Sequence, residues 1–355
     1  MKINLEDNDE SVINLSRSIL VISTLFILVV GVFATVLFFR NTNFNFSPNQ
    51  VSKSASKTGK VKNRVLANLW KAPSESTIPK GTKGEEILYG KELIVHTSKY
   101  LGPKGSVMAI SNGMNCQNCH NDAGKKSFGL NLSAVASTYP QFKARSNTMV
   151  SISGRINGCF QRSLNGTKLD TTSKEMKAMV AYIKWLGQDV KKGVKPKNSG
   201  VEKLAFLDRA ADPIKGKAVY LNNCVSCHGK NGEGLLAASG KEYTYPPLWG
   251  NNSYNDGAGL YRLSNFAGFV KNNMPFGINY ENPLLTDEES WDVAAFVNSQ
   301  PRPHKDQSKD WKQIDKKPFD FPFGPYADKF SEKQHKYGPF APISESKKLK
   351  SNKKA

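Results

Sequence analysis

The amino-acid sequence predicts a mainly α-helical protein. Two tandem helical domains are expected after an N-terminal transmembrane helix and before an irregular C-terminal extension. Three observations lead to this prediction. An almost unbroken apolar run covers residues 19–39 of the 355-residue chain. The pentapeptide Cys-x-x-Cys-His then occurs twice, at residues 116–120 and 224–228. Each copy lies between two stretches with helix-like spacing of apolar residues, so the chain contains a repeated unit.

The apolar run is long enough to cross a bilayer, because about 20 consecutive apolar residues span the hydrocarbon core as a helix. It lies between Arg17 and Arg40. A cleaved signal peptide is the alternative, but its apolar core is usually shorter and ends at small residues, whereas this run ends Val-Leu-Phe-Phe-Arg. We therefore predict a cytoplasmic N-terminus at residues 1–17, a transmembrane anchor at 18–40 and a flexible linker at 41–80.

The two helical domains are aligned through their closing helices. The stretches that begin at Thr172 and Thr286 both start Thr-x-x-Glu, which is the sequence of a capping box. Aligned without gaps, they also match alanine with alanine and an aromatic residue with an aromatic residue. These helices place the first domain at residues 81–195, the second at 201–300 and the C-terminal extension at 301–355. The extension is expected to pack back on the domains and to end in a basic tail.

The opening helices precede the two pentapeptides, at residues 85–101 and 213–222. Their apolar sides are predicted from helical spacing: Ile87, Leu88, Leu93 and Ile94 in the first, and Ile214, Ala218 and Leu221 in the second.

Cys-x-x-Cys-His is the attachment sequence of a c-type haem, in which both thiols form thioethers and the histidine binds the iron. Two disulfides or two zinc sites are the alternatives, but neither explains the histidines or the repeated helical frame. The domains are therefore predicted to be cytochrome c-like, with two covalently bound haem c groups. The attachment residues are Cys116, Cys119, Cys224 and Cys227, and the iron-binding histidines are His120 and His228.

Haem is attached to this motif outside the bacterial cytoplasmic membrane, so both domains are expected in the periplasm, anchored to the inner membrane. The positive-inside rule favours the opposite orientation, because basic residues follow the apolar run; haem attachment outweighs it. The formal net charge of +20 favours anionic partners. The sequence has no recognisable nucleic-acid-binding module, so nucleic acid is not an expected partner.

The sixth iron ligand must come from elsewhere in each domain. In the second, Met274 precedes a proline between the haem motif and the closing helix, and is the predicted ligand. The first domain has no Met-Pro there. The alignment of the closing helices instead places Cys159, the fifth cysteine, one position from Met274. Cys159 is therefore the favoured ligand of the first haem. The alternatives are a structural Cys159, with iron ligation by Met149, Met176, Met179 or His96.

A thiolate stabilises ferric iron, so the first haem is expected to have a lower potential than the second. Arg145, Arg155 and Arg162 lie near Cys159 in the sequence. Guanidinium groups bind sulfonate and phosphate oxygens through paired hydrogen bonds and lower the pKa of nearby thiols. Contact with haem propionates or solvent is the alternative for each arginine. The cluster predicts a site for an anionic, sulfur-reactive substrate.

Three segments carry a family resemblance: Asn115-Cys-Gln-Asn-Cys-His120, Arg155-Ile-Asn-Gly-Cys159-Phe-Gln-Arg-Ser163 and Gln334-His-Lys-Tyr-Gly-Pro-Phe340. Together they resemble the dihaem thiosulfate dehydrogenases over residues 81–343, which leaves the anchor outside. The resemblance implies oxidation of two thiosulfate ions to tetrathionate, or the reverse reaction. It also implies that an electron-accepting cytochrome or respiratory component receives the electrons.

The resemblance also assigns roles to residues. Cys159 would be both the ligand of the first haem and the catalytic sulfur, while Arg145 and Arg155 would hold the sulfonate groups. Ser163 and Gln334 would add hydrogen bonds. Two other functions stay open: a membrane-tethered dihaem electron carrier without its own substrate, and a docking subunit of a respiratory complex. The electron carrier would not require the arginines together with the cysteine.

Overall fold

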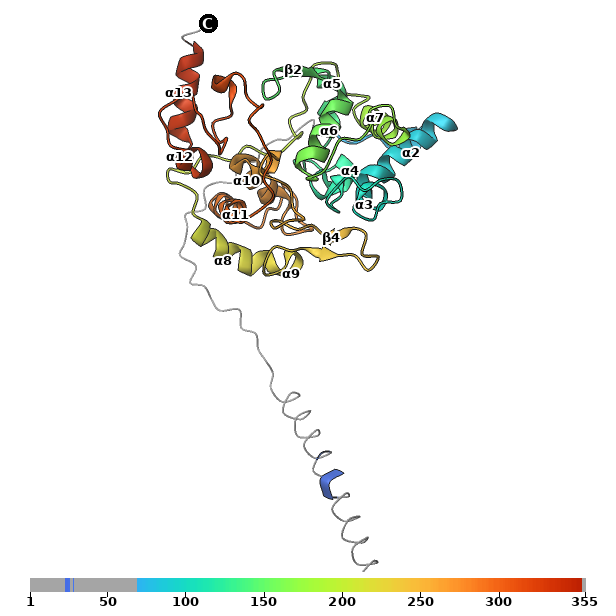
Figure 1. The fold of residues 1–355 in the computed structure, drawn as a ribbon, viewed down its shortest axis with the longest axis horizontal. Helices are drawn as coiled ribbons and strands as arrows, with labels where there is room; N and C mark the ends of the chain where they lie inside the picture. The colour runs from blue at the N-terminus through green and yellow to red at the C-terminus, as the bar shows by residue number, and fades with distance from the viewer. Residues whose placement is uncertain (1–22, 26–27, 29–68, 353–355) are drawn as a thin grey trace, which may run out of the picture. The chain divides into compact units, whose positions relative to one another are not determined.

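The computed structural model describes residues 23–25, 28 and 69–352, and this part of the chain is mainly helical (Figure 1). Within the unit Leu66–Ala355, two domains follow one another, each built around a pair of crossing helices. The prediction of two tandem helical domains is confirmed. Among the described residues, no helix is both long and apolar enough to cross a membrane. The described residues do not include the predicted cytoplasmic segment 1–17. They also leave out nearly all of the predicted anchor at residues 18–40.

The first domain consists of short helices around the pair α2 and α7, together with one β-hairpin. Its elements are η1 (Glu75–Thr77), α2 (Thr82–Val95), α3 (Thr97–Leu101), η2 (Cys116–Asn118), α4 (Asn121–Gly124), α5 (Ser133–Thr138), the antiparallel strands β1 (Gln141–Lys143) and β2 (Thr148–Val150), α6 (Ile152–Arg162) and α7 (Lys174–Leu186).

The second domain repeats this plan around α8 and α11, and the extension follows it. Its elements are α8 (Pro213–Asn223), α9 (Val225–His228), the antiparallel strands β3 (Leu235–Leu236) and β4 (Tyr243–Tyr245), η3 (Gly259–Tyr261), α10 (Leu263–Asn273) and α11 (Asp287–Ser299). The extension contains η4 (Ile314–Lys316), α12 (Glu332–Tyr337) and α13 (Ala341–Asn352).

A glycine lies at the crossing point of the opening and closing helices in each domain. A Cβ atom on Gly90 would lie 2.0 Å from the carbonyl oxygen of Ala178, and one on Gly216 would lie 1.8 Å from that of Asp292. Because no side chain separates the backbones, the helices pack at close range. Ala178 and Asp292 are also paired by the sequence alignment of the closing helices, so the packing supports that alignment.

Replacement of Gly90 or Gly216 by alanine is expected to lower the free energy of unfolding by about 3 kcal/mol, because overpacking forces the helix backbones apart. Urea unfolding of the haem-loaded protein measures the change. Gly259→Ala is the matched control, because a Cβ at Gly259 meets nothing within 4 Å. Equal unfolding midpoints for all three variants would show that close helix packing does not require these glycines.

The two closing helices begin differently. Thr286 caps α11 and forms the predicted capping box with Glu289. In the first domain Ser173 caps α7 instead. The predicted capping box at Thr172 is therefore wrong, because the Thr172 hydroxyl donates to the carboxylate of Asp170 at 2.9 Å.

The apolar side predicted for the second opening helix is also wrong. Ile214 is 83% exposed and Leu221 is 44% exposed, while the opposite face of α8 buries Gly216 and Tyr220 against α11 and its surroundings. Close approach of the helix backbones at Gly216 selects that face. In α2 the prediction holds for Ile87, Leu93 and Ile94, which are buried, but not for Leu88, which is exposed.

The predicted flexible linker ends earlier than residue 80. Residues 69–80 pack on the first domain: the buried Asn198 side chain accepts a hydrogen bond from the Trp70 amide at 3.2 Å and donates to the Trp70 carbonyl at 2.9 Å. Trp185 donates to Thr77 at 3.2 Å. The rest of the predicted linker lies outside the described residues.

The C-terminal extension packs against both domains. Asp310 forms an ion pair with Arg162 of the first domain at 2.9 Å, and the fully buried Asp320 pairs with Arg262 of the second. The sequence predicts an irregular extension, whereas the structure includes the helices α12 and α13 in it.

Candidate functional site

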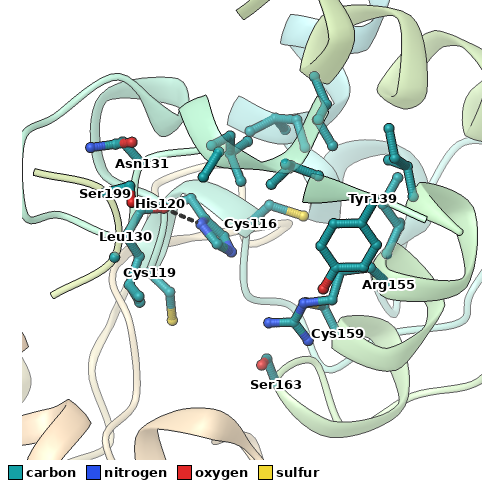
Figure 2. A pocket seen from close by; sticks show the side chains of 18 of the residues that line it. Cys116, Cys119, His120, Leu130, Asn131, Tyr139, Arg155, Cys159, Ser163 and Ser199 are labelled. Atoms are coloured by element: carbon teal, nitrogen blue, oxygen red, sulfur yellow. Dashed lines mark hydrogen bonds between the residues drawn. The ribbon is translucent and has the colours of Figure 1, made fainter. Parts of the chain in front are cut away.

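A cavity of ≈ 380 Å³ in the first domain lies between the first Cys-x-x-Cys-His segment and helix α6 (Figure 2). Cys116, Cys119 and His120 line one part of it. Cys159 and Arg155 line another. Most of the remaining wall is apolar and includes Ile94, Met114, Leu132, Val135, Ile156 and Phe160.

Helix α6 and the residue that caps its C-terminal end present three polar residues to the cavity. Arg155, Cys159 and Ser163 are four residues apart, so the helical period places them on one face. Phe160, the residue after Cys159, is fully buried and belongs both to the core and to the apolar part of the cavity wall. Ser151 caps the N-terminus of the helix, and its side chain accepts a hydrogen bond from the Gly154 amide.

Both haem-motif histidines are oriented by a backbone carbonyl. Nδ1 of His120 lies 2.5 Å from the oxygen of Leu130, and Nδ1 of His228 lies 2.9 Å from that of Pro246. A carbonyl only accepts, so Nδ1 carries the proton in each ring and Nε2 is left as a metal ligand. This second hydrogen bond is typical of iron- and zinc-binding histidines.

Cys159 and Arg155 form an electrostatic pair. Burial alone raises the pKa of Cys159. The charge of Arg155, and then the interactions with His120 and Arg145, outweigh this effect and lower the pKa to about 7. Cys159 in turn raises the pKa of Arg155. The cysteines of the haem motif differ, because burial raises the pKa of Cys116 and of Cys119 to about 12. Cys159 therefore has the thiolate character of a ligand or nucleophile.

The residues at both motifs fit covalently bound haem. None of the five cysteines is paired in a disulfide, so those of the motifs are available for thioether bonds to haem. In the first domain, His120 and Cys159 both line the mainly apolar cavity, and His120 is one of the groups that lower the pKa of Cys159. In the second, Met274 directly follows α10 and packs, partly buried, against the core.

The other ligand candidates for the first haem do not line the cavity. Met176 and Met179 are fully buried in the core of α7, and Met149 is exposed on β2. His96 is hydrogen-bonded to Glu242 of the second domain at 3.1 Å.

Arg145 and Gln334 are not brought to the cavity wall. Arg145 lies in the turn between β1 and β2, where it donates to the Gly257 carbonyl at 3.0 Å and covers the ring of Trp311. Burial, and then the charge of Arg162, lower the pKa of Arg145 to about 10. Gln334 lies in α12 and donates to the Pro339 carbonyl at 3.1 Å.

The sequence reasoning missed cavity residues on the β-hairpin and after α7. Tyr139, Gln141, Lys143, Lys195 and Ser199 also line the cavity. Lys143 and Lys195 add positive charge to it. The only local signal for the β-hairpin is the pair of β-branched residues Thr148 and Val150. Lys195 and Ser199 reach the cavity through long-range packing that has no local signal.

Comparisons with known proteins agree with the two-domain division. The model for the SoxA/TsdA cytochrome c domain matches residues 107–191, and the cytochrome c model matches residues 214–301. A thiosulfate dehydrogenase of Psychrobacter arcticus is 39% identical over 248 residues, which is 69% of this chain and 72% of that protein. One of Allochromatium vinosum is 37% identical over 235 residues, 65% of this chain and 83% of that protein.

A solved structure is also similar. The thiosulfate dehydrogenase TsdBA from Marichromatium purpuratum, in its as-isolated form, matches with a TM-score of 0.61 at 32% identity. The match covers 67% of this chain and half of that one. Together with the two haem motifs and the relatives above, it shows that the chain belongs to the dihaem thiosulfate dehydrogenase family, with two cytochrome c domains that each bind one haem c covalently.

Proposed function

We propose that this protein oxidises two thiosulfate ions to one tetrathionate ion, and that the same site supports the reverse reaction. The observation that carries the proposal is the placement of Cys159 and Arg155 on one face of α6, with Cys159 interacting with His120. A haem ligand that is also a sulfur nucleophile beside a guanidinium suits a sulfur dianion. The similar proteins named thiosulfate dehydrogenase support this choice of substrate.

Cys159 is the proposed catalytic sulfur. Its thiolate forms a sulfur–sulfur bond with the outer sulfur of one thiosulfate, and two electrons leave, which gives a Cys–S–S–SO₃⁻ adduct. The outer sulfur of a second thiosulfate then attacks the adduct at the sulfur that came from the first. The bond to Cys159 breaks, tetrathionate departs, and the thiolate is restored. The two haems, when bound, accept the two electrons, one each.

Arg155 and Ser163 are the proposed binding residues for the sulfonate groups. Arg155 offers a paired set of donors at the cavity wall, and Ser163 offers a hydroxyl on the same helix face. Arg145 acts from the hairpin turn through its charge, which contributes to the low pKa of Cys159. Gln334 stays bonded to Pro339 in this conformation, so a contact with substrate would require movement of α12.

The route of the electrons and the location of the protein follow from the same proposal. Met274 and His228 are the proposed ligands of the second haem, which passes electrons to an external cytochrome or respiratory component. Attachment of haem outside the cytoplasm places both domains in the periplasm. Residues 18–40 are proposed to anchor the protein in the inner membrane, on the basis of their length and apolarity.

The purified dihaem protein is expected to produce tetrathionate from thiosulfate with an artificial electron acceptor, and to consume tetrathionate with an artificial donor. Sulfate and sulfite are the matched anion controls. Product analysis must give one tetrathionate for two electrons accepted. A protein whose haems are redox-active, but which turns over neither sulfur compound, would be the electron carrier of the alternative hypothesis.

A further inference from the structure

The two domains touch at a buried asparagine next to Met274. Nδ2 of Asn273 donates to the Phe269 carbonyl of its own helix at 2.8 Å and to the Phe128 carbonyl of the first domain at 3.1 Å. The side chain is fully buried. Both amide protons are therefore used, and one of them joins the domains.

The segment that Asn273 contacts also orients the proximal histidine of the first haem site. The carbonyl of Leu130, two residues after Phe128, accepts the hydrogen bond from Nδ1 of His120. Phe128 and Leu130 have φ values of 55° and 54°, in the left-handed backbone region that residues other than glycine rarely adopt. Their amides are bonded to the carbonyls of Asn198 and Gly200, each at 2.9 Å. Such a segment has few alternative conformations, so a shift at one carbonyl is transmitted to the other.

Two further contacts connect this loop to the residues after Met274. Nζ of Lys126 donates to the Ile278 carbonyl at 2.8 Å, and the rings of Phe128 and Tyr280 meet edge to face with centroids 5.2 Å apart. The residues on both sides of Met274 are thus fastened to the loop that holds His120.

We propose that Asn273 is a positioning residue that couples the two haem sites. It fixes the Phe128–Leu130 backbone, and through it the hydrogen bond that orients His120. A displacement at Met274 therefore changes the environment of the first proximal histidine. Hydrogen bonds to ligating histidines tune the potential of a metal site, so the second haem site influences the potential of the first. This inference rests on the proposed ligand role of Met274 but not on thiosulfate turnover.

The test replaces Asn273 by leucine in the dihaem protein and records a redox titration and low-temperature EPR without substrate. The reduction equilibrium of the first haem is expected to change by about threefold, the order expected for one lost hydrogen bond, and its EPR g values are expected to shift. Asn272→Leu is the matched control. Asn272 is equally buried on the same helix, but its amide donates to Glu202, outside the loop. It is expected to leave the first haem unchanged.

The proposal is overturned if Asn273→Leu leaves the first haem unchanged, or if Asn272→Leu shifts it equally. Lys126→Met gives a second test, which stands even where Asn273→Leu does not fold. It removes the contact with Ile278, together with a charge that interacts with Asp122, and leaves the hydrogen bonds of Asn273 in place. It is expected to shift the first haem in the same direction, and Asp122→Asn is the control for the loss of the charge interaction. No shift in Lys126→Met would also count against coupling. If Met274 is not a ligand of the second haem, the unsubstituted protein lacks a His/Met EPR signal. That result identifies a failed ligand assignment separately from a failed coupling. Loss of thiosulfate activity affects none of these readouts.

Discussion

Replacement of Cys159 by serine is expected to lower thiosulfate oxidation by about 10³-fold or more, because a covalent step loses its nucleophile. Serine keeps the size and the hydrogen-bonding capacity of the side chain but is a weak nucleophile and a poor haem ligand. The loss is therefore expected in kcat, and tetrathionate reduction is expected to fall in parallel, since both directions use the same adduct. Steady-state assays in both directions measure it.

Spectroscopy separates the loss of a nucleophile from the loss of the fold. The oxidised unsubstituted protein is expected to show a thiolate-type low-spin signal beside a His/Met signal. Cys159→Ser is expected to remove only the first and to leave the second haem reducible. Ser153→Ala, in the first turn of the same helix, is the control for helix perturbation. Turnover that survives the loss of Cys159, or two His/Met signals in the unsubstituted protein, would exclude the proposed role.

Most of the candidate site could be predicted from the internal repeat of the sequence. Both thioether bonds and the iron-binding histidine come from one pentapeptide, so the haem motif can be recognised in the sequence. The alignment of the closing helices is supported by the equivalent crossings at Gly90 and Gly216. Through that alignment the odd cysteine was matched to the position beside Met274. The structure places Cys159 on the cavity wall, interacting with His120.

Positions decided by contacts between distant segments could not be predicted. Arg145 is only ten residues from Arg155 in the sequence, but the β-hairpin and the extension turn it towards Gly257 and Trp311. The buried face of α8 was mispredicted for the same reason, because the approach of α11 overrides the apolar pattern at Ile214. Local patterns give no information about which distant surface a side chain meets.

Replacement of Arg155 by methionine is expected to lower kcat/KM for thiosulfate by about 10²–10³-fold. Loss of one partner from a desolvated charged contact costs about 2–5 kcal/mol. Arg155 lines the cavity, and its charge makes the largest single contribution to lowering the pKa of Cys159. The variant therefore loses both an anion-binding group and stabilisation of the thiolate, so KM is expected to rise and kcat to fall. Arg155→Lys restores the charge but not the paired donors, and is expected to recover only part of the loss.

Arg162→Met is the matched control, because it removes the same kind of side chain from the same helix. Arg162 is paired with Asp310 of the extension. Its loss leaves a mostly buried carboxylate without its partner, so the thermal midpoint is expected to fall while KM stays close to the original. The two arginines thus separate binding from stability: a rise in KM for Arg155→Met alone assigns the anion to the cavity. An equal rise in both variants would mean that the general positive charge of the region, rather than a fixed guanidinium beside Cys159, attracts thiosulfate.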